Sequence, residues 1–208
     1  QQITQTEPQF YLSTKWGRAE LALPGLRGAE NTVLALTVFS KLGFDPGRHL
    51  EALTKVRWPA RMERISINTG KKIFLSGENS PQDTEKKVYL SGDHNPQGIQ
   101  SLIELLKYYP RSHLHLLVGI GVDKNLSGIL DPLFRLPDTS IYLTETPFRG
   151  RKLSQYNEYL KQTKGAWANP HQAFKEIVLR LNAGEMFVVT GSLYLVGEIK
   201  KLCLNQNR

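Results

Sequence analysis

The sequence predicts an α/β fold with a mostly parallel, doubly wound, Rossmann-like sheet, preceded by a hairpin-plus-helices fragment of a second domain. From residue 58 onward, short and nearly continuous apolar runs alternate with amphipathic helical stretches. Such runs are typical of parallel strands that are buried on both faces. Before residue 58 there are only one hairpin pattern and two helical patterns, which is too little for a complete domain.

Residues 1–57 carry the pattern of the end of a larger domain. Apolar residues alternate over Phe10–Leu23, which predicts a short hairpin. The run Asn31–Leu42 predicts a buried helix that ends at Gly43, and Gly47–Val56 predicts a further short helix. We therefore expect residues 1–57 to be one unit and residues 58–208 to be a second domain.

Strands and helices alternate through this second domain. The expected strands are Lys72–Leu75, Val88–Leu90, Leu114–Val118, Ile141–Leu143 and Met186–Thr190. The expected helices are Gly98–Tyr109, His171–Asn182 and Ser192–Leu204, of which the first two place their apolar residues on one stripe. In parallel sheets ligands bind at the loops that follow the carboxyl ends of the strands, so these loops are the candidate sites.

The composition is that of a globular protein. Of the 208 residues, 40% are hydrophobic and 22% are charged, which is enough apolar material for a core. No stretch approaches the roughly 18 apolar residues of a membrane span, and the first residues lack the pattern of a secretory signal. The single cysteine, Cys203, excludes an internal disulfide and a multi-cysteine zinc site. We expect a cytoplasmic protein without a membrane partner.

Positive charge is in excess but spread along the chain. Lysine and arginine number 27 against 19 acidic residues, and the densest basic cluster is Arg149, Arg151 and Lys152. Diffuse charge of this kind favours anionic small molecules, and no basic motif interleaved with aromatic residues is present. The pattern argues against nucleic acid as a partner.

The loop over Leu90–Gln97 is the best candidate site because it follows a predicted strand and opens a helix. Its backbone N–H groups and polar side chains would face the crevice at the strand end, where a helix N-terminus favours an anion. The alternative is that Asp93, His94 and Asn95 only cap the helix.

Two further loops follow predicted strands. In Gly119–Asn125 the glycines permit close approach of a ligand and Lys124 offers a positive charge, but taken alone the pattern favours a flexible turn with a solvated Asp–Lys pair. In Val189–Glu198, Gly191 makes the turn and Ser192 can bond either an anion or the helix backbone.

Several common catalytic motifs are absent from the sequence. There is no phosphate-binding loop, no dinucleotide-binding glycine fingerprint and no nucleophile elbow. His113 and His115 lie two residues apart on a predicted strand, which indicates a surface position with no third metal ligand. No self-contained catalytic site is visible.

Four segments in one order resemble the C-terminal part of the folylpolyglutamate synthase branch of the Mur ligase family. Gly191–Glu198 is similar to the terminal motif of that family, and His94-Asn95-Pro96 to its Asp-Gly-Ala-His-Asn-Pro turn. Trp58–Glu63 is similar to its Trp-Pro-Gly-Arg-Leu-Glu, and Asn31–Leu36 matches a further segment. The resemblance covers essentially the whole chain.

The resemblance implies an ATP-dependent carbon–nitrogen ligase that adds glutamate to folate. In the family ATP phosphorylates a folate carboxylate, and the amino group of glutamate attacks the acyl phosphate to form an amide. The implied ligands are ATP, Mg²⁺, folate and glutamate. The phosphate loop and the magnesium ligands would belong to an N-terminal ATPase domain that these residues lack, so the isolated chain should be inactive. Whether dihydrofolate is also synthesised stays open.

The resemblance assigns roles to the residues of this chain that stand at matching positions. Asn31 and Arg61 would contact the nucleotide, whereas His94 and Ser192 would lie near the incoming glutamate, with Lys124 adding charge there. If these roles hold, the three loops must gather along one rim.

The chain departs from the family pattern in the nucleotide-binding turn. Ser91 stands where the family has an aspartate, and Asp93 where it has an alanine. Either Asp93 takes over the contact from a shifted position or nucleotide binding is weaker.

Two other functions remain open at this stage. One is a Mur ligase that acts on a peptidoglycan precursor. The other is a degenerate, non-catalytic binding domain, which the loss of an acid at position 91 makes conceivable.

Overall fold

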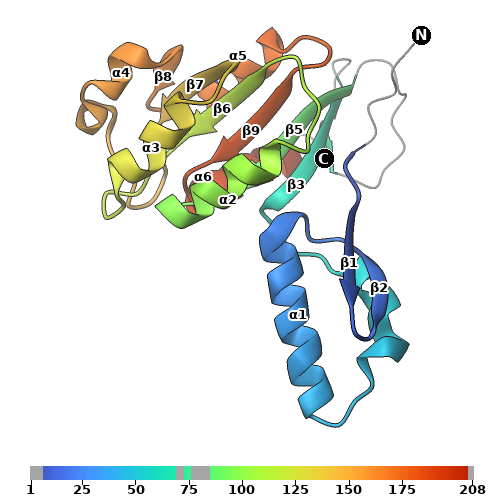
Figure 1. Ribbon diagram of the computed structural model, residues 1–208. Helices are drawn as coiled ribbons and strands as arrows, with labels where there is room; N and C mark the ends of the chain where they lie inside the picture. The colour runs from blue at the N-terminus through green and yellow to red at the C-terminus, as the bar shows by residue number, and fades with distance from the viewer. Residues whose placement is uncertain (1–6, 69–72, 76–84, 206–208) are drawn as a thin grey trace.

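A seven-stranded sheet organises the computed structural model, which describes residues 7–68, 73–75 and 85–205 (Figure 1). The strand order is β4-β3-β5-β9-β6-β7-β8. The run from β5 to β8 is parallel throughout, and β3 and β4 are antiparallel at one edge. The strands are β3 (Arg61–Asn68), β4 (Ile73–Leu75), β5 (Glu85–Ser91), β6 (Leu114–Val118), β7 (Thr139–Thr144), β8 (Gly165–Trp167) and β9 (Met186–Thr190). The predicted fold class is confirmed.

Helices cover both faces of the sheet, as the doubly wound prediction requires (Figure 1). One face carries α2 (Pro96–Leu106) and α3 (Leu126–Phe134), and the other carries α5 (Pro170–Arg180) and α6 (Leu193–Asn205). Two short elements, η2 (Leu153–Tyr156) and α4 (Tyr159–Gln162), lie between β7 and β8.

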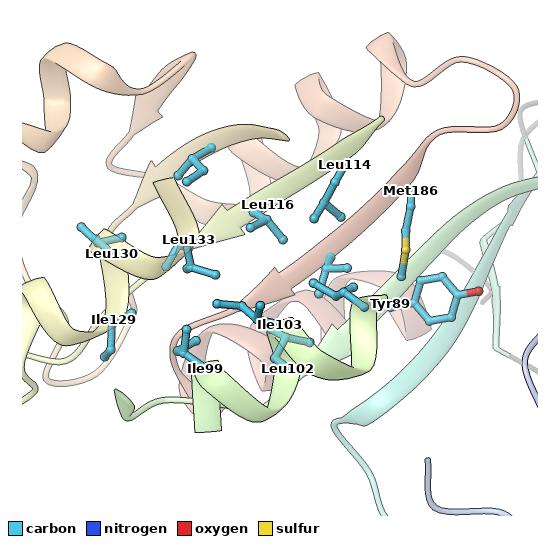
Figure 2. Close-up of a cluster of buried hydrophobic side chains, with 14 of the residues drawn as sticks. Tyr89, Ile99, Leu102, Ile103, Leu114, Leu116, Ile129, Leu130, Leu133 and Met186 are labelled. Atoms are coloured by element: carbon cyan, nitrogen blue, oxygen red, sulfur yellow. The ribbon is translucent and has the colours of Figure 1, made fainter. Parts of the chain in front are cut away.

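The interior strand β6 joins the two cores because its side chains alternate between them. Leu114 and Leu116 pack with Ile99 of α2 and Ile129 of α3, as Figure 2 shows. Leu117 enters the cluster on the opposite face, which α5 and α6 cover. Every residue of β6 and β9 is buried, which explains why both strands are nearly continuous apolar runs.

Asparagine caps three of these helices. The Asn95 side chain accepts a hydrogen bond from the Gly98 N–H at 2.7 Å, and Asn125 and Asn169 do the same for α3 and α5. Asparagine is favoured at this position because its side-chain oxygen satisfies a free N–H of the first turn. Since Asn95 is the cap of α2, Asp93 and His94 are not needed for capping.

An N-terminal arm precedes the sheet (Figure 1). It consists of a hairpin, β1 (Phe10–Thr14) and β2 (Gly17–Leu21), then the helix α1 (Gly25–Lys41) and the 3₁₀ helix η1 (Pro46–Lys55). The predicted hairpin and helices are therefore present. The division of the chain at residue 57 stays a prediction.

The predicted burial of the helix after the hairpin is wrong. Along α1 the buried residues are Gly28, Thr32 and Leu36, whereas Leu34 is 64% exposed and Val38 is 50% exposed. Among the described residues α1 packs on α2, η1 and β1 with one side only. Its apolar periodicity predicted a helix correctly, but burial needs a partner on the other side.

The sequence prediction missed five elements, namely β3, α3, β8 and the two short helices η2 and α4. The strand β3 carries several polar residues and a register shift between Arg61 and Glu63, with Met62 at a φ of +50°. The helix α3 contains Gly128 and Pro132, both of which weaken a helical pattern. The predicted strand over Lys72–Leu75 corresponds to β4, although Lys72 lies outside the described residues.

Three strand-end loops pack against one another at Gly191. Its N–H donates to the Asp93 carbonyl at 2.9 Å, and that carbonyl also accepts the Thr190 hydroxyl at 3.2 Å. The φ of Gly191 is +94°, and a Cβ there would lie 2.7 Å from the Gly119 carbonyl oxygen. Only glycine fits this position. The loops after β5, β6 and β9 consequently form one tightly packed rim.

In the part of the chain that the structure describes, no helix has the length and apolar character needed to cross a membrane.

Replacing Gly191 by alanine tests the close packing of the rim. We expect Gly191→Ala to lower the free energy of unfolding by at least about 2 kcal/mol, because it adds backbone strain and a steric clash. Urea unfolding measures the effect. Gly197→Ala is the matched control, since a Cβ on this α6 residue meets no atom within 4 Å. It should stabilise the chain by about 0.5–1 kcal/mol. Equal effects of the two substitutions would contradict the packing argument.

Candidate functional site

Two cavities open beside the rim, and together they contain all seven predicted site residues. The larger one, of about 520 Å³, lies between the start of α1, the segment around Arg61 and helix α2. We call it the α1–α2 cavity. The smaller one, of about 210 Å³, lies between the loops after β5, β6, β7 and β9. We call it the rim cavity.

The α1–α2 cavity brings together the four residues predicted to contact a nucleotide. Asn31 comes from α1, Arg61 from the start of β3, and Ser91 and Asp93 from the loop after β5. They are up to 62 positions apart in the sequence, from 31 to 93, yet line one hollow. Their roles stay predictions.

Asp93 is held by its neighbours in a fixed position. The buried Ser91 hydroxyl donates to Asp93 Oδ2 at 2.6 Å, and the Arg61 guanidinium lies 3.5 Å from Asp93 Oδ1. A hydroxyl bonded to a carboxylate restricts its rotation while leaving lone pairs free. The arrangement can therefore present an oriented acceptor, with a cation beside it, to a ligand in the α1–α2 cavity.

The sequence prediction missed three side chains of this cavity. Trp58 and Tyr108 are aromatic and more than half exposed. Arg27 donates from Nε to the Ser101 hydroxyl and from a terminal nitrogen to the Gln97 carbonyl, so it links α1 to α2. Trp58 could have been recognised, because it lies in one of the four segments on which the resemblance rests. Arg27 had no local signal, since its partners are about 70 residues away.

The rim cavity brings together the three residues predicted to bind glutamate. His94, Lys124 and Ser192 come from the loops after β5, β6 and β9, and all line the same hollow. His94 Nδ1 lies 2.8 Å from the Gly92 carbonyl, so Nδ1 carries the proton and Nε2 is left for a ligand. The expected gathering of these loops is observed, and the residue roles stay predictions.

Ser192 caps α6 and also faces the rim cavity. Its oxygen accepts the Tyr194 N–H at 3.1 Å, which leaves the hydroxyl hydrogen free to donate to a ligand. Capping and ligand binding, which the sequence left as alternatives, are compatible here.

Lys124 is paired within its own loop. Its ammonium lies 2.9 Å from Asp123 Oδ2, and this hydrogen bond is the main reason that the pKa of Asp123 lies below its ordinary value. Asp123 is largely exposed, so the interaction is screened by solvent. The predicted Asp–Lys pair of a solvated turn is thus present, although it also borders the rim cavity.

An aromatic and basic wall of the rim cavity was not predicted as part of the site. The Phe148 and Tyr194 rings lie 4.9 Å apart, and the Arg149 guanidinium lies 5.4 Å from the Phe148 ring centre. The sequence marked Arg149 only as part of the densest basic cluster. Its position after the parallel strand β7 was the signal that could have placed it in the site.

A single backbone step separates the two cavities. Asp93 lines the α1–α2 cavity and the next residue, His94, lines the rim cavity. Consecutive Cα atoms are about 3.8 Å apart. Ligands in the two cavities would therefore approach each other closely.

His115 in β6 and His113, just before that strand, lie away from this rim, and the predicted surface position of the pair is wrong for His115. The His115 ring is buried, with Nδ1 3.2 Å from the Tyr142 hydroxyl and Nε2 3.1 Å from Glu185. Burial lowers the pKa of His115, and this effect outweighs the opposing hydrogen bond and charge of Glu185. Across residues 7–68, 73–75 and 85–205, no three His, Cys, Asp or Glu side chains are grouped to hold a metal ion.

The chain matches a family model and several solved structures. The model described as "Mur ligase, glutamate ligase domain" matches residues 78–193, which is more than half of the chain. No curated protein matches the sequence. The chain is similar in structure to Mycobacterium tuberculosis folylpolyglutamate synthase complexed with ADP, with a TM-score of 0.72 and 22% identity. The similarity covers 95% of this chain and 45% of that one.

Two further structures have the same fold. For Thermotoga maritima folylpolyglutamate synthase the TM-score is 0.66 at 25% identity, and 90% of this chain and 41% of that chain are covered. For E. coli FolC in complex with ADP, without folate substrate, the TM-score is 0.72 at 20% identity, with 97% and 45% covered. The chain thus spans less than half the length of each of these proteins.

The buried His115 predicts a pH dependence of stability. Its folded pKa lies below the unfolded value of about 6.5, so the unfolded chain takes up the proton first as the pH falls. We expect the free energy of unfolding to decrease from about pH 6.5 down to the folded pKa of His115. His115→Gln should reduce this slope in urea unfolding measured from pH 7 to pH 5.

Glu185 and Tyr142, which both contact His115, do not titrate in the same way within this window. The pKa of Glu185 is held below its ordinary value, mainly by hydrogen bonds from Asn182 and His115 that outweigh burial, and the pKa of Tyr142 is raised by burial. His113 lies beside His115 and acts with burial to lower the pKa of His115. The charge of Arg180 on α5 opposes the effect of burial on the pKa of Tyr142. The exposed His49 provides the control, since His49→Gln should keep the slope of the wild type. A slope that survives in His115→Gln would refute the assignment.

Proposed function

The chain belongs to the Mur ligase family through its glutamate ligase domain, and we propose that it forms part of an ATP-dependent ligase that joins glutamate to folate. The observation that carries the proposal is the pair of cavities divided by the single step from Asp93 to His94. One cavity has the chemistry to bind a nucleotide and the other to bind an anionic amino acid. The activity would require an ATPase domain beyond these 208 residues.

The α1–α2 cavity is assigned to ATP. Asp93, oriented by Ser91, would accept hydrogen bonds from ribose hydroxyls, and Arg61 would add a positive charge. Asn31 would contact the nucleotide from α1, and the exposed Trp58 ring offers a stacking surface for the base. The ADP in the Mycobacterium tuberculosis and E. coli structures supports this class of ligand.

Magnesium would accompany ATP but is not assigned to this chain. The part of the chain that the structure describes lacks a group of three acidic or histidine side chains suited to a metal ion. As the resemblance implies, the magnesium ligands are expected in the ATPase domain, and none of the roles given to this chain depends on them.

The rim cavity is assigned to the incoming glutamate. Ser192 can donate to a carboxylate at the N-terminus of α6, where free backbone N–H groups also favour an anion. Lys124 adds a positive charge, and His94 Nε2 can accept a hydrogen bond from the amino group.

The proposed reaction explains why the two ligands must lie close together. A carboxylate is a poor electrophile until a phosphoryl group from ATP makes one of its oxygens a leaving group. The glutamate nitrogen then attacks the acyl carbon, the carbon–oxygen bond to phosphate breaks, and the nitrogen loses a proton. Positioning accounts for a large part of such catalysis, and this chain would supply it for the amine.

The non-catalytic alternative has less support than the ligase. It depends on Ser91 replacing an acid, but the carboxylate of Asp93 lies 2.6 Å from the Ser91 hydroxyl and keeps a negative charge in the same cavity. A ligase acting on a peptidoglycan precursor would activate a different carboxylate as the acyl donor, so the substrate has to be tested directly.

The intact protein that contains this chain provides that test. We expect phosphate release from ATP to require both a reduced folate and glutamate, with mass spectrometry detecting a folate longer by one glutamyl unit. Replacing the reduced folate with dihydropteroate tests whether the protein also synthesises dihydrofolate. The 208-residue chain alone should be inactive. Phosphate release with a muramoyl precursor but not with folate would favour the peptidoglycan alternative, and no turnover with either would favour the non-catalytic one.

Substitutions at positions 91 and 93 test the nucleotide assignment in the intact protein. Asp93→Asn should raise the KM for ATP by roughly tenfold, since it removes a charged acceptor worth about 1.5 kcal/mol or more. Ser91→Ala should raise it less, because the carboxylate remains but loses its orienting hydrogen bond. Ser91→Asp alone should also weaken ATP binding, because two carboxylates would then lie in contact.

The double variant Ser91→Asp with Asp93→Ala removes that repulsion and should recover part of the affinity. Asp138→Asn, which removes an exposed carboxylate next to the start of β7, is the matched control and should leave the KM unchanged. Tighter ATP binding in Ser91→Asp would mean that Asp93 does not perform this role.

A further inference from the structure

The rim cavity contains two cationic side chains, and their charges are not equally available. The Lys124 ammonium is already paired with Asp123 at 2.9 Å. Among the described residues, Arg149 has no carboxylate within ion-pair distance; its charge acts on the exposed Asp123 only at longer range, and its guanidinium contacts the Phe148 ring. Arg149 is therefore the available positive charge on the cavity wall.

The backbone around Arg149 is fixed by the neighbouring loop. Its φ is +46°, in the left-handed region, and its carbonyl accepts the Val122 N–H at 3.0 Å. Gly150 bridges to Gly121, and a Cβ on Gly150 would lie 2.3 Å from the Thr146 carbonyl oxygen. A left-handed residue other than glycine is strained and persists where its surroundings enforce it.

Arg151 also holds the backbone around Arg149 in place, through its own hydrogen bonds to the loop after β6. Its N–H donates to the Ile120 carbonyl at 2.8 Å, and its guanidinium donates to the carbonyls of Val122 and Lys124, each at 3.1 Å. Arg151 thus joins the loops after β6 and β7. The result is a rigid support from which Arg149 borders the cavity.

The aromatic wall prepares the Arg149 side chain for a planar ligand. Phe148 contacts the guanidinium and packs against Tyr194 at 4.9 Å. Stacking against a ring limits the orientations of the guanidinium without using its N–H donors. A guanidinium with free donors matches a carboxylate through two parallel hydrogen bonds, which an ammonium cannot reproduce.

We propose that Arg149 binds the side-chain carboxylate of the incoming amino acid and so makes the rim cavity selective for a dicarboxylic amino acid. The proposal rests on the proposed function and refines it, because Arg149 rather than the paired Lys124 supplies the second anion contact. The α-carboxylate is left for Ser192 and the N-terminus of α6. A neutral amino acid such as glutamine would leave the Arg149 charge unpaired.

Steady-state kinetics of the intact protein tests this assignment. In Arg149→Gln we expect the KM for glutamate to rise tenfold to a hundredfold, while kcat at saturating glutamate changes less than threefold. The KM values for ATP and folate should not change. The preference for glutamate over glutamine should fall by a similar factor, whereas a purely structural role for Arg149 would not alter that preference. Arg149→Lys should give an intermediate KM.

One control and one comparison make the outcome decisive. The control is Arg135→Gln, which removes an exposed positive charge after α3 and should leave every parameter unchanged. The comparison is Lys124→Met, which should raise the KM for glutamate less than Arg149→Gln does, because Lys124 is already paired with Asp123. If wild-type protein consumes glutamate but Arg149→Gln keeps its KM and preference, the inference is overturned and the proposed function stands. If Arg149→Gln does not fold, a wild-type KM in Arg149→Lys overturns the inference equally. If wild-type protein never uses glutamate, the proposed function itself fails.

Discussion

The close approach of Gly191 to the neighbouring loops is the constraint on which both cavities depend. The turn after β9 meets the Asp93 carbonyl on one side and Gly119 on the other, and no side chain can be inserted there. This contact holds the loops after β5, β6 and β9 at fixed positions relative to one another. Each loop then supplies its own polar group, so the site inherits the rigidity of the sheet.

The loop after β5 lines both cavities because adjacent side chains enter different ones. Asp93 belongs to one cavity and His94 to the other, while Asn95 caps α2 and keeps the turn in place. A reaction that transfers a phosphoryl group and then forms an amide needs such proximity. The exchange of an acid and a small residue between positions 91 and 93 fits this scheme, since the serine hydroxyl and the carboxylate touch.

The rim cavity illustrates how charge becomes available in a site. Two loops are joined by backbone hydrogen bonds and by the Arg151 guanidinium, and these contacts use Arg151 for structure. Lys124 is neutralised by its neighbour Asp123. Among the described residues, the Arg149 guanidinium makes no hydrogen bond of the Arg151 kind and no ion pair of the Lys124 kind. Arg149 and Arg151 carry the same charge and differ in the contacts of their guanidinium groups. The selectivity proposed for the cavity follows from that difference.

The sequence by itself determined the mostly parallel fold class, the fully buried strands β6 and β9, and the starts of α2, α5 and α6 to within two residues. The apolar runs of β6 and β9 and the asparagine caps at 95 and 169 are local signals, readable from hydrophobicity and backbone preference. Only the tertiary structure decided that one side of α1 is exposed, that His115 is buried and that Asp93 and His94 face different cavities. It also decided that Arg149 makes no ion pair with any residue that the structure describes. These properties depend on contacts between residues far apart in the chain, and no local pattern records such contacts.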